Sequence, residues 1–464
     1  MPVNSFDDYP MSWRPVLDRR MRPLYRQLSD ALERDIRTGR LMPGTKLPPQ
    51  RELADFLDIN LSTVTKAYRL ASEKGLLSAA MGNGTYVSYD ALSSARLIAP
   101  FEKDVINMGA TVPDPSGNEP LLALLRSMLA EPGSGRWFSH HQEDDPAWQW
   151  QKEAASQLLR LCGIEAVPET VLFSCGGQNG LSAVMAALFR RGDKIAVDDH
   201  LYPGLKTAAA MFGIQLIPVP MTEKGMDLSF LSFLLKTETV AGVYLIPTCQ
   251  NPTTATMPAA AREKAAALMK AHGCLLVEDG TYQLTEPALP PVASFMKDRA
   301  VFLTSLSKVA APGLRMGILT APPAFHGVLS DALYSLNVSV TPLMEELSAR
   351  MIASGLFPSI LARHREETLR RDAVVRRCFP KDVCLGAGTD IFRWLRLSPP
   401  WTADDFQKEA LRRGVLVYSA SKFAVGKTKP RPAVRLSICS PALPDLSRAL
   451  SILQSLIRKG PSSK

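Results

Sequence analysis

The sequence predicts two folded units, a small helical unit with a β-hairpin and a larger α/β unit built around a mainly parallel sheet. Three observations support this prediction. The chain has 464 residues, more than a single hydrophobic core usually serves. Helical periodicity followed by a hairpin signal occupies the first part, whereas short apolar runs alternate with amphipathic stretches later. The stretch SYDALSSARLIAP separates the two patterns, so we set the boundaries at 12–90, 91–104 (linker) and 105–464.

The N-terminal unit is predicted to hold three helices and a hairpin. Leucine or isoleucine recurs every four residues from Leu24 to Ile36, which gives one helix an apolar stripe. Two prolines (48–49) precede QRELADFL, a short second helix, and LSTVTKAYRLASEKG forms a third after the break DIN. Asn83 and Gly84 stand between two strand-like runs, the signature of a tight hairpin. This order, mostly α with a β wing, is that of a winged helix-turn-helix.

A winged helix-turn-helix places its second motif helix in the major groove of DNA, with that helix's N-terminal residues at the base edges. Residues 11–90 hold 13 Lys/Arg against 9 Asp/Glu, a surplus of 13 − 9 = +4 that suits a polyanion. For any one of these residues, a purely structural role is about as well supported as a contact with DNA. Ser62 can simply cap the helix, and Arg51 can be solvated. The candidate DNA contacts are Arg51, Ser62, Thr63, Thr65, Lys66 and, in the wing, Gly82.

Residues 44–87 resemble the GntR family of bacterial winged-helix regulators. The family pattern G-x-x-LP-x-x-RELA, then TV-x-x-AY, a glycine and G-x-GTYV, is matched throughout this range. Leu61 stands where the family usually has a basic residue, a departure that concerns base preference. The resemblance implies binding to double-stranded DNA.

Six short apolar runs in the larger unit are predicted strands. They are TVLFS (170–174), KIAVDD (194–199), IQLIPV (214–219), GVYLIP (242–247), CLLVED (274–279) and AVFLTS (300–305). Helical patterns lie between them, which indicates a parallel sheet covered on both faces. In such a sheet, ligand-binding residues gather at the carboxyl ends of the strands.

The polar residues that follow these runs suit one small molecule. They offer a phosphate cradle, an aromatic ring for stacking, a carboxylate, two donors and an amine, and pyridoxal 5′-phosphate (PLP) requires this set. Each residue taken alone is better explained as part of a turn or as a surface cation. In the order of those roles, the candidates are Gly177, Gln178, Ser305 and Arg315, then Tyr202, Asp279, Asn251 and Tyr282, and Lys308.

Residues 105–464 resemble the fold-type I aminotransferases, through QNPT, VEDGTY and SLSK…GLRMG. The resemblance implies a PLP-dependent transferase fold with a smaller C-terminal α+β subdomain. It also implies that Lys308 forms the internal aldimine, that Asp279 pairs with the pyridine nitrogen, and that Asn251 and Tyr282 bind the ring oxygen. Arg435, in AVRLSI, would clamp a substrate carboxylate. His140 and His141 are candidates for a residue that crosses to a partner's cofactor.

The whole chain resembles the MocR subfamily of GntR-type regulators, which join these two units. The resemblance implies a bacterial transcription factor that binds a DNA operator as a head-to-tail homodimer. Its large domain would sense PLP or a small amino compound through aldimine exchange at Lys308. A working aminotransferase with an accessory DNA-binding domain stays open, because transamination needs the same Lys308, Asp279 and Arg435. A large domain that serves only as a dimerisation scaffold would not need the lysine.

Composition argues against a disulfide-bonded, metal-binding, secreted or membrane protein. Seven cysteines lack any C-x-x-C pair, and no His cluster has metal spacing, so we expect reduced thiols and no metal site. The start MPVNSFDDYPMSWRP lacks the apolar run of a secretory signal, and no stretch approaches the length of a membrane span. These observations predict a cytoplasmic protein.

Overall fold

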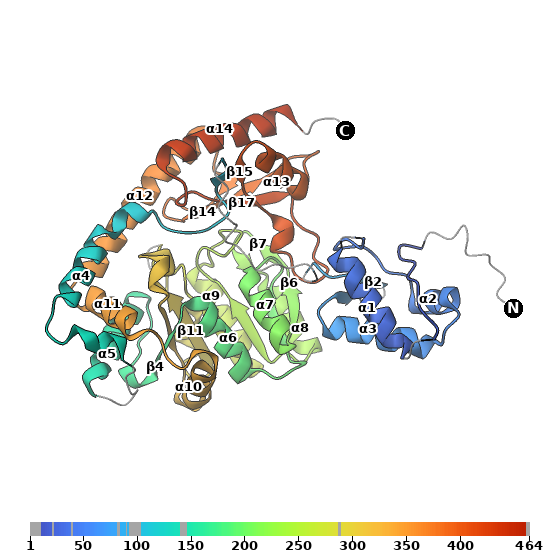
Figure 1. Ribbon diagram of the computed structural model, residues 1–464, viewed down its shortest axis with the longest axis horizontal. Helices are drawn as coiled ribbons and strands as arrows, with labels where there is room; N and C mark the ends of the chain where they lie inside the picture. The colour runs from blue at the N-terminus through green and yellow to red at the C-terminus, as the bar shows by residue number, and fades with distance from the viewer. Residues whose placement is uncertain are drawn as a thin grey trace.

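The computed structural model describes residues 11–20, 23–38, 40–80, 84–89, 91, 104–139, 146–285 and 289–460. Three parts are visible in Figure 1: a small N-terminal domain, a large domain with a central sheet, and a smaller domain that contains the C-terminal helix. The fold class predicted from the sequence is therefore confirmed.

The N-terminal domain is the predicted winged helix-turn-helix. Its elements are α1 (Leu24–Arg37), α2 (Gln50–Leu57), α3 (Leu61–Glu73), β1 (Leu77–Ala80) and β2 (Gly84–Val87), and the two strands pair antiparallel. The apolar stripe of α1 packs against Val64 and Tyr68 of α3 in one core. Asn60 caps α3, because its Oδ1 accepts a hydrogen bond from Ser62 N at 2.8 Å. Ser62 is therefore free of the capping role.

The large domain is built on a seven-stranded sheet. Its order is β4 (Val171–Ser174), β12 (Gly317–Thr320), β11 (Ala300–Ser305), β10 (Leu275–Asp279), β9 (Gly242–Leu245), β5 (Lys194–Asp198) and β6 (Gln215–Val219). All six predicted strands are present. The strand β12 was not predicted, and it runs antiparallel to both of its neighbours, so the sheet is mixed. The connection 306–316 is too short for a parallel crossover, which needs about a dozen residues or more.

Helices cover both faces of this sheet (Figure 1). One face packs against α6 (Gly177–Leu188), α7 (Pro203–Phe212) and α10 (Pro323–Asn337). The other packs against α5 (Pro146–Leu161), α8 (Leu228–Thr237), α9 (Ala259–Ala271) and α11 (Pro342–Ala353). Successive residues of β10 point to opposite cores, Leu276 to one and Val277 to the other. The large domain also includes α4 (Glu119–Leu129), β7 (Met221–Thr222) and β8 (Gly225–Met226).

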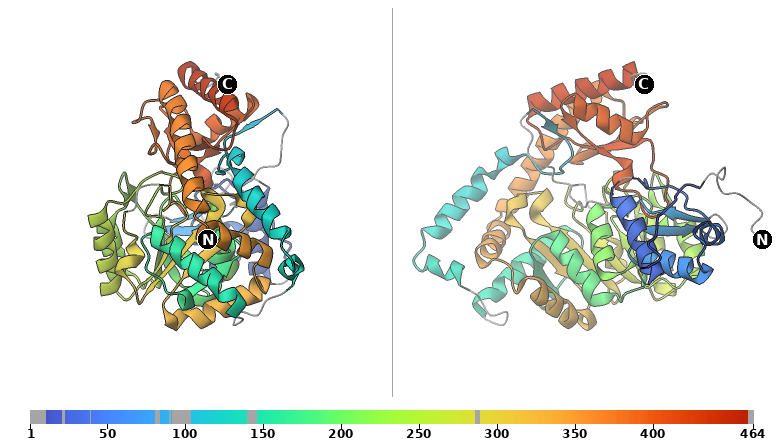
Figure 2. Two further views of the ribbon diagram at one scale, coloured as in Figure 1. Left: turned by 90° about the vertical axis from the view of Figure 1, so that its left-hand side faces the viewer. Right: turned by 45° about the vertical axis from the view of Figure 1, so that its right-hand side comes forward.

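The smaller domain is α+β and lies above the large domain in both views of Figure 2. Its sheet has the order β13 (Cys384–Leu385), β14 (Phe392–Arg396), β17 (Ala433–Ser437) and β16 (Tyr418–Ser419). The helices α12 (Leu356–Cys378), α13 (Ala403–Arg412) and α14 (Leu443–Lys459) flank it, and β15 (Val415–Leu416) pairs with β3 (Ile106–Asn107) from the start of the large unit.

Three further findings concern the described residues. The seven cysteines are free thiols. No described helix combines the length and the apolar character that a membrane crossing requires. Among the same residues, no cluster of three or more His, Cys, Asp or Glu side chains is arranged to hold a metal ion.

Candidate functional site

A cavity of about 630 Å³ lies at the carboxyl ends of the parallel strands. All nine cofactor residues proposed from the sequence line it, although they come from five separate strand ends and from the loop before β12. Further lining residues include Ala110, Thr111, Leu181, Thr281 and Ser307. The structure thus brings together the nine proposed residues, which lie up to 138 positions apart in the chain, from Gly177 to Arg315.

Lys308 ends a short 3-10 helix that follows β11. Its Nζ donates to Thr111 O at 2.6 Å and to Thr111 Oγ1 at 3.2 Å. Burial and, second to it, the nearby charge of Arg435 lower the pKa of this amine, Asp279 opposes them, and the result is a pKa of about 8. About a tenth of the amine is therefore neutral at pH 7, and a neutral amine can attack an aldehyde.

The rate of PLP capture by Lys308 is expected to depend on pH. Because only the neutral amine reacts, the rate should rise about tenfold per pH unit below pH 8 and level off above it. Stopped-flow absorbance of the PLP-free protein mixed with PLP between pH 6.5 and 9.5 measures this profile. A rate that keeps rising steeply up to pH 9.5 would show that the lysine titrates like an ordinary surface lysine.

Asp279 ends β10 and is the buried carboxylate of the cavity, with 8% of its surface exposed. Its Oδ2 accepts from the Tyr244 hydroxyl at 2.8 Å, and its Oδ1 accepts from Thr281 N at 3.0 Å. Burial raises the pKa of Asp279, whereas these hydrogen bonds and the charge of Lys308 act in the opposite direction. Two hydrogen bonds thus orient the Asp279 carboxylate, which can pair with a cationic group in the cavity such as a protonated ring nitrogen.

The phosphate end of the cavity is formed by a helix N-terminus and a guanidinium. The helix α6 begins at Gly177, so its partial positive charge faces the cavity. Gly176 has φ +83°, and a Cβ there would lie 2.5 Å from Arg315 Nη2, so this position requires glycine. Arg315 Nη2 also donates to Cys175 O at 3.0 Å. Ser305 Oγ lies 3.1 Å from Met316 O, which fixes the hydroxyl beside this end.

Tyr202 precedes α7 and presents its ring to the cavity. A Cβ on Gly204 would lie 2.2 Å from this ring and 2.0 Å from Gln178 Oε1, so the glycine makes room for both side chains. Gln178 Nε2 donates to Gly204 O at 3.0 Å. Burial raises the pKa of Tyr202 to about 12, which keeps the phenol neutral and suitable for stacking.

Asn251 and Tyr282 are brought together as a pair, with Asn251 Nδ2 donating to the Tyr282 hydroxyl at 3.4 Å. Both side chains are buried, and both line the cavity. They therefore offer two adjacent polar groups at one edge of a bound ring.

Arg435 differs from the other candidates, because it is fully buried and is not among the residues that line the cavity. Its Nη1 donates to Asn251 Oδ1 at 2.7 Å and its Nη2 to Gly109 O at 2.5 Å, while Nε has no partner. The guanidinium carbon lies 4.9 Å from the Phe423 ring centre and 5.6 Å from that of Tyr418. Burial lowers the pKa of Arg435 to about 10. Asn251 thus links this buried cation to the cavity.

Three residues whose hydrogen bonds hold Asp279 and Lys308 were missed by the sequence analysis. Tyr244 lies one residue before the end of β9 and reaches the neighbouring Asp279. Thr281 follows Asp279 by two positions, as the turn there requires. Thr111 lies 197 positions before Lys308, and no local pattern could connect these two residues. Strand-end counting could have found Tyr244 and Thr281 but not Thr111.

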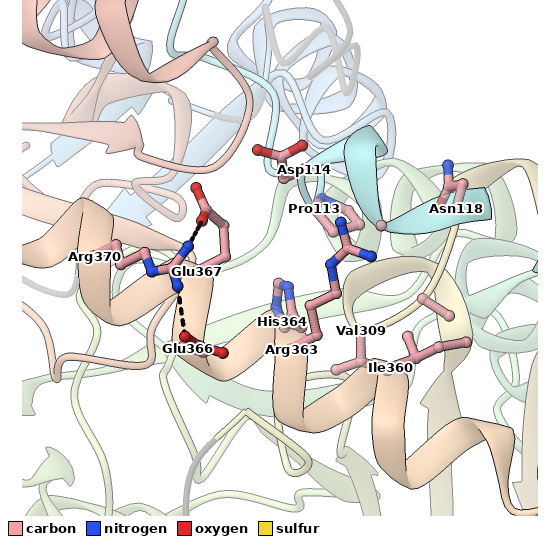
Figure 3. Close-up of a pocket in the computed structure, with 12 residues that line it drawn as sticks. Pro113, Asp114, Asn118, Val309, Ile360, Arg363, His364, Glu366, Glu367 and Arg370 are labelled. Atoms are coloured by element: carbon pink, nitrogen blue, oxygen red, sulfur yellow. Dashed lines mark hydrogen bonds and ion pairs between the residues drawn. The ribbon is translucent and has the colours of Figure 1, made fainter. Parts of the chain in front are cut away.

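A second cavity, of about 390 Å³, lies between the segment 113–118 and α12 (Figure 3). Arg370 lines it and pairs with Glu366 at 2.6 Å on its own helix. His364 lines it as well, and burial lowers the pKa of that imidazole to about 4. This cavity has a paired arginine and a neutral histidine but none of the nine cofactor candidates, so it is not the PLP site.

Most of the described DNA-binding candidates are exposed. Arg51, Ser62, Thr65 and Lys66 are exposed and Thr63 is half-buried. Thr65 Oγ1 donates to Gln50 Oε1 at 2.7 Å, which ties the two helices of the motif together. Gly82, in the wing, and the two histidines 140–141 lie outside the described residues.

Comparison with known proteins agrees with both halves of this description. The family described as "Bacterial regulatory proteins, gntR family" matches residues 24–87, and "Aminotransferase class I and II" matches residues 138–453. An archaeal alanine:glyoxylate aminotransferase structure aligns with a TM-score of 0.71 and 18% identity, covering 84% of this chain and 98% of that one. At that identity the likeness concerns the fold. Fold and site together define a DNA-binding regulator with an aminotransferase-like, PLP-binding domain.

Two relatives are named as regulators. The "Uncharacterized HTH-type transcriptional regulator YdeF" of Bacillus subtilis (strain 168) is 44% identical over 460 residues, which is 98% of this chain and 99% of the relative. The "Probable rhizopine catabolism regulatory protein MocR" of Rhizobium meliloti is 25% identical, over 77% of this chain and 78% of its own length. The chain belongs to the MocR-type regulators of the GntR family.

Proposed function

We propose that this protein senses PLP or a small amino compound through aldimine exchange at Lys308 and thereby alters its binding to a double-stranded DNA operator. The observation that carries the proposal is the partly neutral, cavity-lining Lys308 amine in a chain that also has an exposed recognition helix. From the recognition helix we infer that the protein binds DNA. From the lysine we infer that its effector is an aldehyde or an amine that can exchange with the lysine.

The residues of the cavity divide the work of holding such a ligand. PLP supplies an aldehyde conjugated to an electron-withdrawing ring. Arg315 and the N-terminus of α6 would hold the phosphate, and Asp279 would stabilise a proton on the ring nitrogen. Thr111 holds Lys308 Nζ through two hydrogen bonds until the amine reacts. Thr111 would also hold the free Nζ whenever this amine is not engaged with the ligand.

A working aminotransferase is the second candidate, because Lys308 and Arg435 are also the groups that transamination would use. Sensing requires that the ligand have different affinities for two states of the protein, whereas catalysis requires release of a keto acid. Footprinting on the chain's own upstream DNA, with keto-acid production measured in parallel, separates the two. We expect a specific footprint that changes with PLP and slow or no turnover of common amino acids. Fast turnover without a specific site would reverse the assignment.

We also propose that the active form is a head-to-tail homodimer, since two DNA-binding domains in one assembly would read two half-sites. Phe138, Tyr334 and Val338 of the large domain are exposed apolar side chains, and a subunit interface would cover such groups. Sedimentation of the full chain with an operator containing one or two half-sites tests this assembly.

Replacing Arg51 by alanine is expected to weaken operator binding. A lost guanine contact would cost about 1–3 kcal/mol and relax the preference at one base pair. A lost phosphate contact would instead reduce the slope of log K against log salt by about one. Fluorescence anisotropy at several salt concentrations distinguishes these results. Arg126→Ala, which removes an exposed arginine of the large unit, is the matched control, and equal behaviour of the two variants would exclude Arg51 from the interface.

A further inference from the structure

A loop of the smaller domain touches both the cofactor cavity's surroundings and the DNA-binding domain. We name residues 419–426 the coupling loop; it joins β16 to the segment before β17. Two hydroxyls of the loop are held by Asp404 of α13, which accepts from Ser419 Oγ at 2.5 Å and from Ser421 Oγ at 2.8 Å. The first half of the loop is thereby anchored to the smaller domain.

The middle of the coupling loop is fastened to the segment that carries Tyr202. Leu201 N donates to Phe423 O at 2.9 Å, and Val425 N donates to Asp199 O at 3.0 Å. The buried Lys206, on α7, donates from Nζ to Ala424 O at 2.7 Å. These three bonds flank Tyr202 on both sides, so a displacement of this ring segment is passed to the loop backbone.

The same part of the loop also contacts Arg435. Phe423 has no exposed surface, and its ring centre lies 4.9 Å from the guanidinium carbon. The Phe423 ring also packs edge-on against Trp394, with the ring centres 6.4 Å apart. A ligand carboxylate that binds Arg435 must change the packing around this guanidinium. The Phe423 ring is part of that packing.

The far end of the coupling loop meets the DNA-binding domain. Tyr89 N, just after the wing, donates to Gly426 O at 2.8 Å. Gly426 has φ +56°, and a Cβ placed there would lie 3.4 Å from Ser78 Oγ on β1. The phenol of Tyr89 lies against Gly44, where a Cβ would be 2.5 Å from its oxygen. Tyr89 therefore joins the loop to both the wing and the turn before α2.

We propose that the coupling loop transmits the occupancy of the cofactor cavity to the position of the DNA-binding domain. This inference rests on the proposed sensing function and names its path. Ligand contacts at Tyr202 and Arg435 converge on Phe423, and three residues later Gly426 holds the wing. A covalent link between positions 426 and 78 should therefore abolish the effect of the ligand on DNA affinity, while both binding sites stay intact.

The test is a reversible cross-link in the full-length chain. In the double variant Ser78→Cys with Gly426→Cys, the two positions are within reach of a disulfide. Operator affinity is measured with and without PLP, under oxidising and reducing conditions, alongside both single variants. Wild-type and reduced protein are expected to change operator affinity with PLP by about tenfold. Oxidised protein should change it by less than about twofold while its PLP absorbance band stays the same.

The outcomes separate the two proposals. A PLP effect that survives in the oxidised protein overturns the coupling loop and leaves the sensing function in place. The absence of any PLP effect in wild-type protein, despite a normal absorbance band, overturns the sensing function and with it the path. A disulfide that joins two chains on a non-reducing gel overturns the contact within one chain.

Hydrogen exchange of the unmodified protein gives a second measurement, which holds even if the cysteine variants misfold. Addition of PLP is expected to change the exchange of peptides covering residues 199–206, 419–426 and 84–91 together. A change limited to the first of these peptides would contradict transmission along the loop.

Discussion

Replacing Lys308 by alanine is expected to abolish the absorbance band between about 410 and 430 nm that PLP gives when joined to a lysine. The same change should remove the effect of PLP on operator affinity, because the ligand then has no covalent anchor in the cavity. Absorbance spectra before and after borohydride, followed by anisotropy with operator DNA, measure both results.

Lys194→Ala is the matched control, since Lys194 lies on β5 of the same sheet but pairs with Glu238 at 2.6 Å. The control should keep the band and the DNA response. Persistence of the band in Lys308→Ala would sink the assignment of this lysine. Loss of the band with an unchanged PLP effect on DNA would instead show that sensing does not proceed through the lysine.

Replacing Arg435 by lysine is expected to weaken the response to amino acids by at least about tenfold, or about 1.4 kcal/mol. Arginine presents two parallel N–H donors to a carboxylate, and lysine cannot reproduce that geometry. Lysine retains the buried positive charge, so a cation remains near Asn251 Oδ1 and Gly109 O, which accept hydrogen bonds from Arg435 in the native protein. Spectral titration of the PLP-loaded protein with amino acids measures the change.

Simple amines without a carboxylate are the internal control for this variant. Their titration should be nearly the same in wild-type and Arg435→Lys protein, because they do not use the guanidinium. A parallel loss for both classes of compound would indicate general damage to the cavity. An unchanged response to amino acids would remove Arg435 from ligand recognition.

Much of the fold could be predicted from the sequence because its signals are local. Short β-branched runs mark the strands, and the polar residues after them are placed by the rule for parallel sheets. Asp279, Lys308 and Asn251 were found in this way, and all three line the cavity. The helix-turn-helix could be predicted equally well, because its turns are determined by Asn60, glycines and prolines that lie within a few residues of each helix end.

The remainder depends on contacts between distant segments. The antiparallel strand β12 is only four residues long, and its direction follows from the short connection 306–316. The bond between Thr111 and Lys308 spans 197 positions. The aromatic enclosure of Arg435 comes from three strands or loops of the smaller domain. The hydrogen bond from Tyr89 to Gly426 joins two domains. No periodicity within one window encodes such pairings.

The amide of Asn251 has a consequence for which molecules this protein can distinguish. Its nitrogen serves Tyr282 in the cavity while its oxygen serves the buried Arg435, at 3.4 Å and 2.7 Å. One planar group therefore joins the cavity to the buried guanidinium. If a ligand engages both, we expect that its two contributions to the binding free energy are not additive. Selectivity then resides in the distance between the two functional groups of the ligand as much as in their chemistry.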